Sequence, residues 1–212
     1  MLTVHHLGVS QSERIVWLCE ELGIDYKLER YDRDPVTRLA PAALKALHPM
    51  GTAPVITDGD LVMAESGAII EYIIATYGKG RFKVAPDHPD FAQFIYWFHF
   101  GNGSLQAILH RYLNIRRLEP RPDHPTLLGV ERQLASALGM MDKRLGAVDY
   151  LAGAFSAADI ITVFCLTTMR SFAPYDLGKY PNILAYLKRI GARPAYQRAM
   201  QKGDPGMTPK LG

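Results

Sequence analysis

The stretch at residues 49–72 constrains this chain more than any other. Ala53-Pro54 opens a short apolar run there, and a second apolar run follows Asp58-Gly59. Because Asp-Gly accepts positive φ at both central positions of a two-residue turn, the pattern predicts an antiparallel hairpin. Proline donates no hydrogen bond, so Pro54 at the mouth of the first strand indicates an edge or a special turn. A cis Ala53-Pro54 bond would be a specified feature of such a turn, since cis is a small minority even before proline.

Directly after the hairpin, Glu65-Ser66 is predicted to open an amphipathic helix, because isoleucines recur at helical spacing over residues 69–74. The Ser66 hydroxyl and the first backbone N–H groups would then lie at a helix N-terminus, which suits a carboxylate. A cis bond would let the Ala53 backbone face a ligand instead of a neighbouring strand. The stretch therefore fits a site for an anionic, peptide-like ligand, and it equally fits an ordinary hairpin whose helix starts with Glu-Ser.

The chain before this stretch predicts a βαβ unit with a parallel strand pair. Residues 2–7 and 26–31 have strand patterns, and an apolar helical face runs from Ser12, a suitable N-cap, to Gly23. The next helix is expected over residues 36–47. With the hairpin and the helix after it, the order becomes β-α-β-α-β-β-α.

The rest of the chain is predicted to be a second, all-helical domain. Residues 1–80 carry 7 Lys and Arg against 11 Asp and Glu, whereas residues 81–212 carry 17 against 10, and this shift supports a boundary near residue 80. We expect an α/β domain over residues 1–79, a linker over 80–89 and a helical domain over 90–212, with its Gly- and Pro-rich tail from Gly203 on the surface. Helices are expected over 89–116, softened at Gly101-Asn102-Gly103, over 127–145, and from about 156, 180 and 193 onward.

Ser156 and Asp159 predict a capping box at the start of one of these helices. A serine at the N-cap accepts from a backbone N–H in the first turn, and the acid three residues later reaches back to the N-cap N–H. We assign this pair to folding and not to chemistry.

Composition excludes several classes of protein. Hydrophobic residues make up 48% and charged residues 21% of the chain, as in ordinary globular domains. No run approaches the roughly 20 apolar residues of a membrane span, and no signal-peptide pattern opens the chain. The net charge of +3 and the lack of a Lys/Arg run argue against nucleic acid. We therefore expect a cytoplasmic protein with neither a membrane nor a nucleic-acid partner.

The histidines and cysteines do not predict a metal site. His5 and His6 are adjacent on a predicted strand, so their side chains point to opposite faces and cannot share one ion. Cys19 and Cys165 lie in apolar helical patterns and in no C-x-x-C motif, so both are expected to be small buried hydrophobes.

The stretch at residues 49–72 resembles the glutathione-binding core of the cytosolic glutathione transferases, whose usual shape is G-x-x-P-x-L-x-D-G-x-x-x-x-E-S. The match runs through Gly51, Pro54, Asp58, Gly59, Glu65 and Ser66. Ile56 stands where the family often has Leu, and Thr52 stands where many members have Lys. The resemblance implies a thioredoxin-like N-terminal domain followed by the helical domain, with glutathione as co-substrate and no metal.

The opening of the chain resembles a bacterial and fungal branch of serine-type transferases with an HHL…S-x-S-x-R pattern. In this family a Tyr, Ser or Cys in the loop after the first strand donates a hydrogen bond to the glutathione sulfur. Ser10 is the preferred donor here, while Ser12 is the helix N-cap and is counted with the glutathione-binding residues. In theta- and zeta-like classes the catalytic serine would fall on Val9, so a backbone N–H of the loop or another residue stays open as the donor.

The resemblance also implies roles for residues outside the loop. Glu65 and Ser66 would hold the γ-glutamyl end of glutathione, and the Ala53 backbone, with its geometry fixed by Pro54, would pair with the cysteinyl backbone. The glycyl carboxylate would lie within reach of His48 or Thr52. The electrophile site would lie between the two domains, and its expected lining residues are Val9, Phe98, Asn102 and Leu105.

Two functions remain open from the sequence. The first is conjugation of glutathione thiolate to a small hydrophobic electrophile, with glutathione peroxidase activity as a side reaction on the same site. The second is a non-catalytic glutathione transferase-like module for protein interaction. The family resemblance implies a homodimer in either case.

Overall fold

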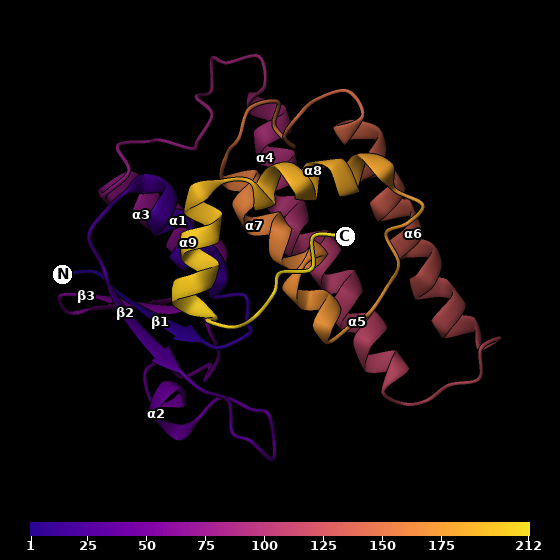
Figure 1. The fold of residues 1–212 in the computed structure, drawn as a ribbon, viewed down its shortest axis with the longest axis horizontal. Coiled ribbons are helices and arrows are strands. Elements are labelled where there is room, and N and C mark those ends of the chain that lie inside the picture. Colours follow the sequence, from indigo (N-terminus) through magenta and orange to yellow (C-terminus); the bar gives the residue numbers. More distant parts are fainter. The chain divides into compact units, whose positions relative to one another are not determined.

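A sheet of four strands, in the order β2-β1-β3-β4, forms the base of the N-terminal part in this computed structural model, which describes residues 1–212 (Figure 1). β1 (Thr3–Leu7) pairs in parallel with β2 (Lys27–Tyr31) and antiparallel with β3 (Val55–Asp58). β3 pairs antiparallel with β4 (Leu61–Ala64), which confirms the predicted hairpin. The turn residues are Gly59 and Asp60 and not the predicted Asp58-Gly59, because Asp58 pairs with Leu61, and only Gly59 has positive φ. The central strand β1 is buried from Val4 onward because it has a neighbour on each side.

Three helices complete the predicted order, which is the thioredoxin-like arrangement. α1 (Glu13–Leu22) and α3 (Ser66–Thr76) pack against each other, and both contact the sheet. The short α2 (Ala42–Lys45) adds Leu44 to a separate small cluster with Leu7 and Ala53.

The prediction of a helix over residues 36–47 is wrong in its first half. The Asp34 carboxylate accepts hydrogen bonds from the backbone N–H groups of Val36 and Thr37, at 3.0 and 2.7 Å, which holds this segment in a turn. Arg38 then has φ of 61°, and only after Pro41 does the helix α2 begin. An Asp side chain that bonds the backbone two and three residues on competes with helix formation.

The chain divides into two compact units, residues 1–83 with 191–209 and residues 84–190 with 210–212. The prediction from sequence placed all of 90–212 in one helical domain, whereas α9 (Pro194–Gly203) packs against α1 (Figure 1). The Trp17 and Tyr196 rings meet edge to face at 5.0 Å. Arg193 donates two hydrogen bonds to Glu21, at 2.7 and 2.8 Å, so α9 is fixed to α1 by an aromatic pair and a bidentate ion pair.

The second unit contains the helices α4 (Phe91–Phe100), α5 (Ala107–Arg116), α6 (Pro125–Leu145), α7 (Ala157–Leu166) and α8 (Pro181–Gly191). Between α4 and α5 the chain forms a π-helical segment, Gly101–Gln106, where the sequence predicted a softened helix. A Cβ on Gly101 would lie 2.8 Å from Thr162 Oγ1, so only glycine allows this close approach to α7. No helix is both long enough and apolar enough to cross a membrane.

The capping box at α7 is confirmed. Ser156 Oγ accepts from the Ala158 N–H at 3.3 Å, and the Asp159 carboxylate accepts from the Ser156 N–H at 2.9 Å. The same buried carboxylate accepts from the Leu151 N–H and the Tyr186 hydroxyl, each at 3.0 Å. Burial raises the pKa of Asp159 to about 6, although these hydrogen bonds favour the charged form.

Candidate active site

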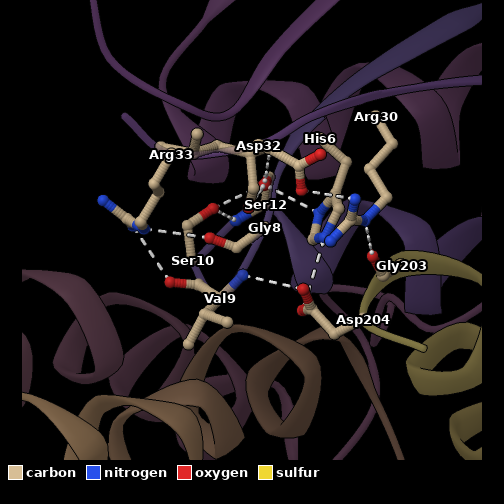
Figure 2. A network of polar contacts seen from close by, with 11 residues as sticks. His6, Gly8, Val9, Ser10, Ser12, Arg30, Asp32, Arg33, Gly203 and Asp204 are labelled. Atoms are coloured by element: carbon tan, nitrogen blue, oxygen red, sulfur yellow. Dashed lines mark hydrogen bonds and ion pairs between the residues drawn. The ribbon is translucent and has the colours of Figure 1, made fainter. Parts of the chain in front are cut away.

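Hydrogen bonds from other parts of the chain to its backbone N–H and C=O groups hold the loop that joins β1 to α1. The Gly8 N–H donates to the Tyr31 carbonyl at 2.9 Å, and the Val9 N–H donates to Asp204 Oδ1 at 2.8 Å (Figure 2). Arg33 donates to the carbonyls of Gly8 and Val9, both at 3.0 Å. These bonds fix Val9 at φ of 52°, a conformation that a β-branched residue rarely adopts. Such an outlier is often found beside a functional site, where the surrounding structure imposes it.

The two serines of this loop form one buried pair. Their hydroxyl oxygens lie 2.7 Å apart, and Ser10 Oγ also accepts from the Ser12 N–H at 3.3 Å. Ser12 occupies the N-cap position of α1, as predicted, but its side chain makes no capping bond. Instead, Ser12 Oγ accepts from the Leu7 N–H at 3.1 Å and lies 2.9 Å from His6 Nδ1. The capping role predicted for the Ser12 side chain is therefore wrong, because its hydroxyl bonds to the Leu7 N–H of β1 and to His6 and not to the first turn of α1.

His6 extends this pair to the end of α9. Its Nε2 atom lies 3.3 Å from Asp204 Oδ2, and the exposed fractions of the two side chains are 0% and 2%. Burial alone would raise the pKa of Asp204, but the His6 contact, the Val9 N–H and the charge of Arg30 lower it below its usual value. Asp204 thus stays ionised. The prediction that the tail from Gly203 lies on the surface is wrong at Gly203 and Asp204, which are both buried.

A second set of contacts ties the same loop to the predicted peptide-binding stretch. Gln11 Nε2 donates to the Ala53 carbonyl at 2.9 Å. Arg14, whose exposed fraction is 0%, donates from Nη1 to Gln11 Oε1 at 3.0 Å and to Ser66 Oγ at 3.3 Å. The structure therefore brings Ser10, Ala53 and Ser66 together through two residues to which the sequence gave no role. The sequence signal for Arg14 is its place as the last residue of the S-x-S-x-R pattern, directly before the apolar run at 15–18, and the sequence assigned it no contact.

The backbone has special geometry at Ala53-Pro54, as the sequence suggested, and also at Glu65, where the sequence gave no such expectation. The Ala53-Pro54 bond is cis, which confirms the special turn. Glu65 is exposed and is the N-cap residue of α3 with φ of 70°, an uncommon value for a residue with a side chain. Ser66 begins the helix and is buried, so its hydroxyl and the first N–H groups of α3 share the helix N-terminus.

The other predicted site residues lie outside the contacts that join the Ser10 loop to Ala53 and Ser66. Thr52 is exposed, and His48 Nδ1 accepts from the Met50 N–H at 3.2 Å. Phe98 and Leu105 are buried in the helical unit, and Asn102 lies in its π-helical segment. No geometry tests their roles toward a ligand, and these roles stay predictions.

The structure contains no group of three or more His, Cys, Asp or Glu side chains that could hold a metal ion. His5 points away from His6 to the Tyr31 hydroxyl and to Thr57 Oγ1, at 3.1 and 3.2 Å. Burial lowers the pKa of His5, so this imidazole is neutral at neutral pH. Cys19 and Cys165 are buried free thiols, and burial raises the pKa of Cys19 far above its usual value.

The four-stranded sheet, its cis proline and the helical unit define a thioredoxin-like protein with an all-helical second unit. Comparison with known proteins gives the family. The profile described as "Glutathione S-transferase, N-terminal domain" matches residues 10–76, and "Glutathione S-transferase, C-terminal domain" matches residues 101–194. Glutathione S-transferase 3 of Schizosaccharomyces pombe is 30% identical over 216 residues, covering 95% of this chain and 88% of that protein.

Solved structures agree. A glutathione S-transferase from Actinobacillus pleuropneumoniae superposes with a TM-score of 0.86 at 33% identity, covering 97% of this chain and 95% of that one. A glutathione transferase family member from Pseudomonas fluorescens, solved with two glutathione bound, shares the fold with a TM-score of 0.76 at 22% identity and coverage of 94% and 92%. This chain belongs to the glutathione S-transferase family.

Proposed function

We propose that this chain is a glutathione transferase of the serine type, which binds glutathione, forms its thiolate and adds it to a small hydrophobic electrophile. The observation that carries the proposal is the pair of contacts from Gln11 to Ala53 and from Arg14 to Ser66, because they hold the Ser10 loop against the peptide-binding stretch. The names of the relatives and the glutathione bound to the Pseudomonas fluorescens protein support the same ligand.

Glutathione would lie along the cis-proline turn and the start of α3. The γ-glutamyl carboxylate would bind at the N-terminus of α3, where Ser66 and the helix dipole favour negative charge. The cysteinyl backbone would pair with the backbone of Ala53, and the glycyl carboxylate would reach toward His48 or Thr52. Glu65, exposed beside Ser66, is placed to receive the α-amino group of the γ-glutamyl end.

Ser10 is the proposed donor to the sulfur. A hydrogen bond to the thiolate stabilises the charged form, and a free cysteine thiol has a pKa of about 8.5, so this donor increases the thiolate fraction at neutral pH. The alternative donor to the sulfur is a backbone N–H of this loop. The Gly8 and Val9 N–H groups are less suited to this role, because they are already bonded to Tyr31 and Asp204. Of the Gly8, Val9 and Ser10 N–H groups, the Ser10 N–H is the one that remains as a donor beside the hydroxyl.

The proposal for the electrophile concerns the residues that line its site and the reactions that the thiolate performs there. Val9, Phe98, Asn102 and Leu105 are the proposed lining of its site, and peroxide reduction is a second reaction that the same thiolate could perform. A homodimer, a cytoplasmic location and the lack of a metal cofactor belong to the same proposal, and they rest on the family.

One observation favours a second candidate function, a non-catalytic interaction module. Val9 stands at the position where related serine-type classes would place the catalytic residue, and its N–H is bonded to Asp204. The built contacts around Ala53 and Ser66 argue for the enzyme, since an interaction module does not need a peptide-binding site.

A glutathione titration separates the two functions. We expect the wild type to be retained on immobilised glutathione, to show thiolate absorbance and to conjugate a chloronitroaromatic electrophile. Ser10→Ala should lower kcat/KM about 10- to 100-fold, because a hydrogen bond to a charged group contributes about 1.5–3 kcal/mol. Ser136→Ala, the same change on the exposed face of α6, serves as the matched control. Lack of glutathione binding by the wild type would support the interaction module.

A further inference from the structure

Four buried polar side chains form a line from the end of α9 to the proposed sulfur donor. Asp204 Oδ2 lies 3.3 Å from His6 Nε2, His6 Nδ1 lies 2.9 Å from Ser12 Oγ, and Ser12 Oγ lies 2.7 Å from Ser10 Oγ (Figure 2). The exposed fraction of each of the four residues is between 0% and 6%. The catalytic role proposed for Ser10 uses only the last member of this line.

The heavy atoms accommodate one arrangement in which His6 is neutral. With its proton on Nε2, His6 faces the Asp204 carboxylate at 3.3 Å, a charge contact without hydrogen-bond geometry, and Nδ1 accepts from the Ser12 hydroxyl. Ser12 Oγ then accepts from the Leu7 N–H and from the Ser10 hydroxyl. In this arrangement the Ser10 proton points into the protein, so Ser10 offers a ligand only an acceptor oxygen.

The same atoms accommodate a second arrangement in which His6 is an imidazolium. Both ring nitrogens then carry a proton: Nδ1 donates to Ser12 Oγ, and the imidazolium forms an ion pair with Asp204 through Nε2. The Ser12 hydroxyl then donates to Ser10 Oγ, which leaves the Ser10 hydroxyl free to donate outward. No heavy atom needs to move between the two arrangements.

We propose that Ser10 and Ser12 pass the thiol proton of glutathione to His6, where Asp204 balances the charge; this inference rests on the proposed function. The S–H bond breaks, and its proton goes to Ser10 Oγ as the Ser10 proton moves to Ser12 and the Ser12 proton moves to His6 Nδ1. The products are a thiolate that accepts a hydrogen bond from Ser10 and an imidazolium between Ser12 and Asp204. Three protons each move by one step, so the net transfer is one proton from the thiol to His6, and no group is oxidised or reduced. Ser12, His6 and Asp204 are positioning residues in this scheme.

The charges around His6 suit this transfer. Asp204 is ionised and buried, so its attraction to an imidazolium is screened little by solvent. Arg30, opposite His6 on β2, opposes a second positive charge, but its guanidinium is bonded to Asp32 and to the Gly203 carbonyl. Charged groups on the elements around His6 include Asp204 after α9, Arg30, Asp32 and Arg33 on and after β2, and Glu13 and Arg14 in the first turn of α1.

The direct test is the ¹⁵N NMR spectrum of the His6 ring in the wild-type protein, first free, then saturated with glutathione, and then saturated with S-methylglutathione. S-methylglutathione carries no thiol proton. We expect the His6 nitrogens to change from the neutral to the imidazolium pattern with glutathione and to remain neutral with S-methylglutathione. An unchanged His6 spectrum in a complex that shows thiolate absorbance would overturn the relay. If neither peptide binds, the proposed function itself fails, and the two failures are thereby distinguished.

Calorimetry of glutathione binding in buffers of different ionisation enthalpy gives a second readout, the number of protons released to solvent. The wild type should release well below one proton per thiolate formed, whereas Ser12→Ala, which breaks the line, should release about one, because the thiol proton then has no internal acceptor. His5→Gln is the matched control, since it removes a neighbouring imidazole on the opposite face of β1 and should release as few protons as the wild type. Equal release by the wild type and Ser12→Ala would overturn the relay. The NMR comparison decides alone if the variant does not fold.

Discussion

Two helices of this protein, α1 and α7, have a buried serine at the N-cap, and the two serines make different hydrogen bonds. Ser156 begins α7 and closes a complete capping box with Asp159. Ser12 begins α1 at the equivalent position, yet its hydroxyl turns away from the helix to Leu7, His6 and Ser10. At α7 the serine serves to begin the helix. At α1 the serine hydroxyl does not cap the helix, so we assign it to the site around Ser10.

The carboxylates associated with the two serines, Asp159 and Asp204, also differ in where they lie in the chain and in the direction of their pKa shifts. Asp159 is three residues from Ser156, and burial raises its pKa to about 6. Asp204 comes from the far end of the chain, and the pKa of Asp204 is lowered despite its burial. The Asp159 carboxylate accepts hydrogen bonds from a loop and from the start of α7, whereas the Asp204 carboxylate is a negative charge beside His6.

The largest effect should come from Asp159→Ala. The substitution leaves the Ser156 N–H, the Leu151 N–H and the Tyr186 hydroxyl without their acceptor in the core. Each buried group without a partner costs about 1–3 kcal/mol, so we expect the free energy of unfolding to fall by about 3–5 kcal/mol. Urea denaturation measures this change, and a loss below about 1 kcal/mol would contradict the structural role.

The pH dependence of stability sharpens the comparison. The pKa of Asp159 in the folded protein, about 6, lies above its unfolded value, so the folded state binds more protons between these two values. The stabilisation is therefore fully present below the unfolded pKa and is lost as pH rises through the folded pKa. Relative to Asp159→Asn, which does not titrate there, the wild type should lose about 2–3 kcal/mol between pH 4 and pH 7. A difference between the two proteins that stays constant over this range would contradict the sign.

The two serines should separate stability from function. Ser156→Ala should cost about 1–2 kcal/mol of unfolding free energy, as for the loss of an N-cap, and leave the pKa of bound glutathione unchanged. The loss of stability can be followed by thermal denaturation. A Ser156→Ala protein as stable as the wild type would show that Asp159 alone maintains the start of α7.

The smallest effects should come from two glycines in helices. Gly139 lies in the exposed part of α6, and an added methyl group there would meet no neighbouring atom, so Gly139→Ala should stabilise the protein by about 0.5–1 kcal/mol. A Cβ on Gly203 would lie 3.1 Å from His6 Nε2. Gly203→Ala should therefore lose this gain in stability and disturb the His6–Asp204 contact. Thermal denaturation of both variants measures the difference, and equal stabilisation by both substitutions would show that the His6 ring yields freely.

Local sequence signals predicted the parts of the fold that depend on neighbouring residues. The hairpin at residues 55–64, the cis Ala53-Pro54 bond and the Ser156–Asp159 box each need only residues a few positions apart. Each is present, although the hairpin turns at Gly59-Asp60 and not at Asp58-Gly59. The turn after Asp34 was missed, although its cause is also local, because one carboxylate that bonds two backbone N–H groups outweighs helix propensity.

The site could be predicted only in part, because its connections are long-range. Asp204 lies 195 residues from Val9 in the sequence, and Gln11 lies 42 residues from Ala53. No periodicity or spacing relates such pairs. Ala53 and Ser66 were identified from the hairpin and helix pattern, and Ser10 from the family resemblance. Gln11 and Arg14, whose contacts connect this loop to Ala53 and Ser66, needed the structure.

The most direct test of the account is the pKa of the bound glutathione thiol, from thiolate absorbance against pH, in the wild type, Ser12→Ala and Ser156→Ala. We expect the pKa to lie below about 8.5 in the wild type and in Ser156→Ala, and to rise toward about 8.5 in Ser12→Ala. That result would show that the serine at α1 serves the thiolate and the serine at α7 serves the fold. A thiol pKa that is the same in all three proteins would contradict the assignment of Ser12 to the site.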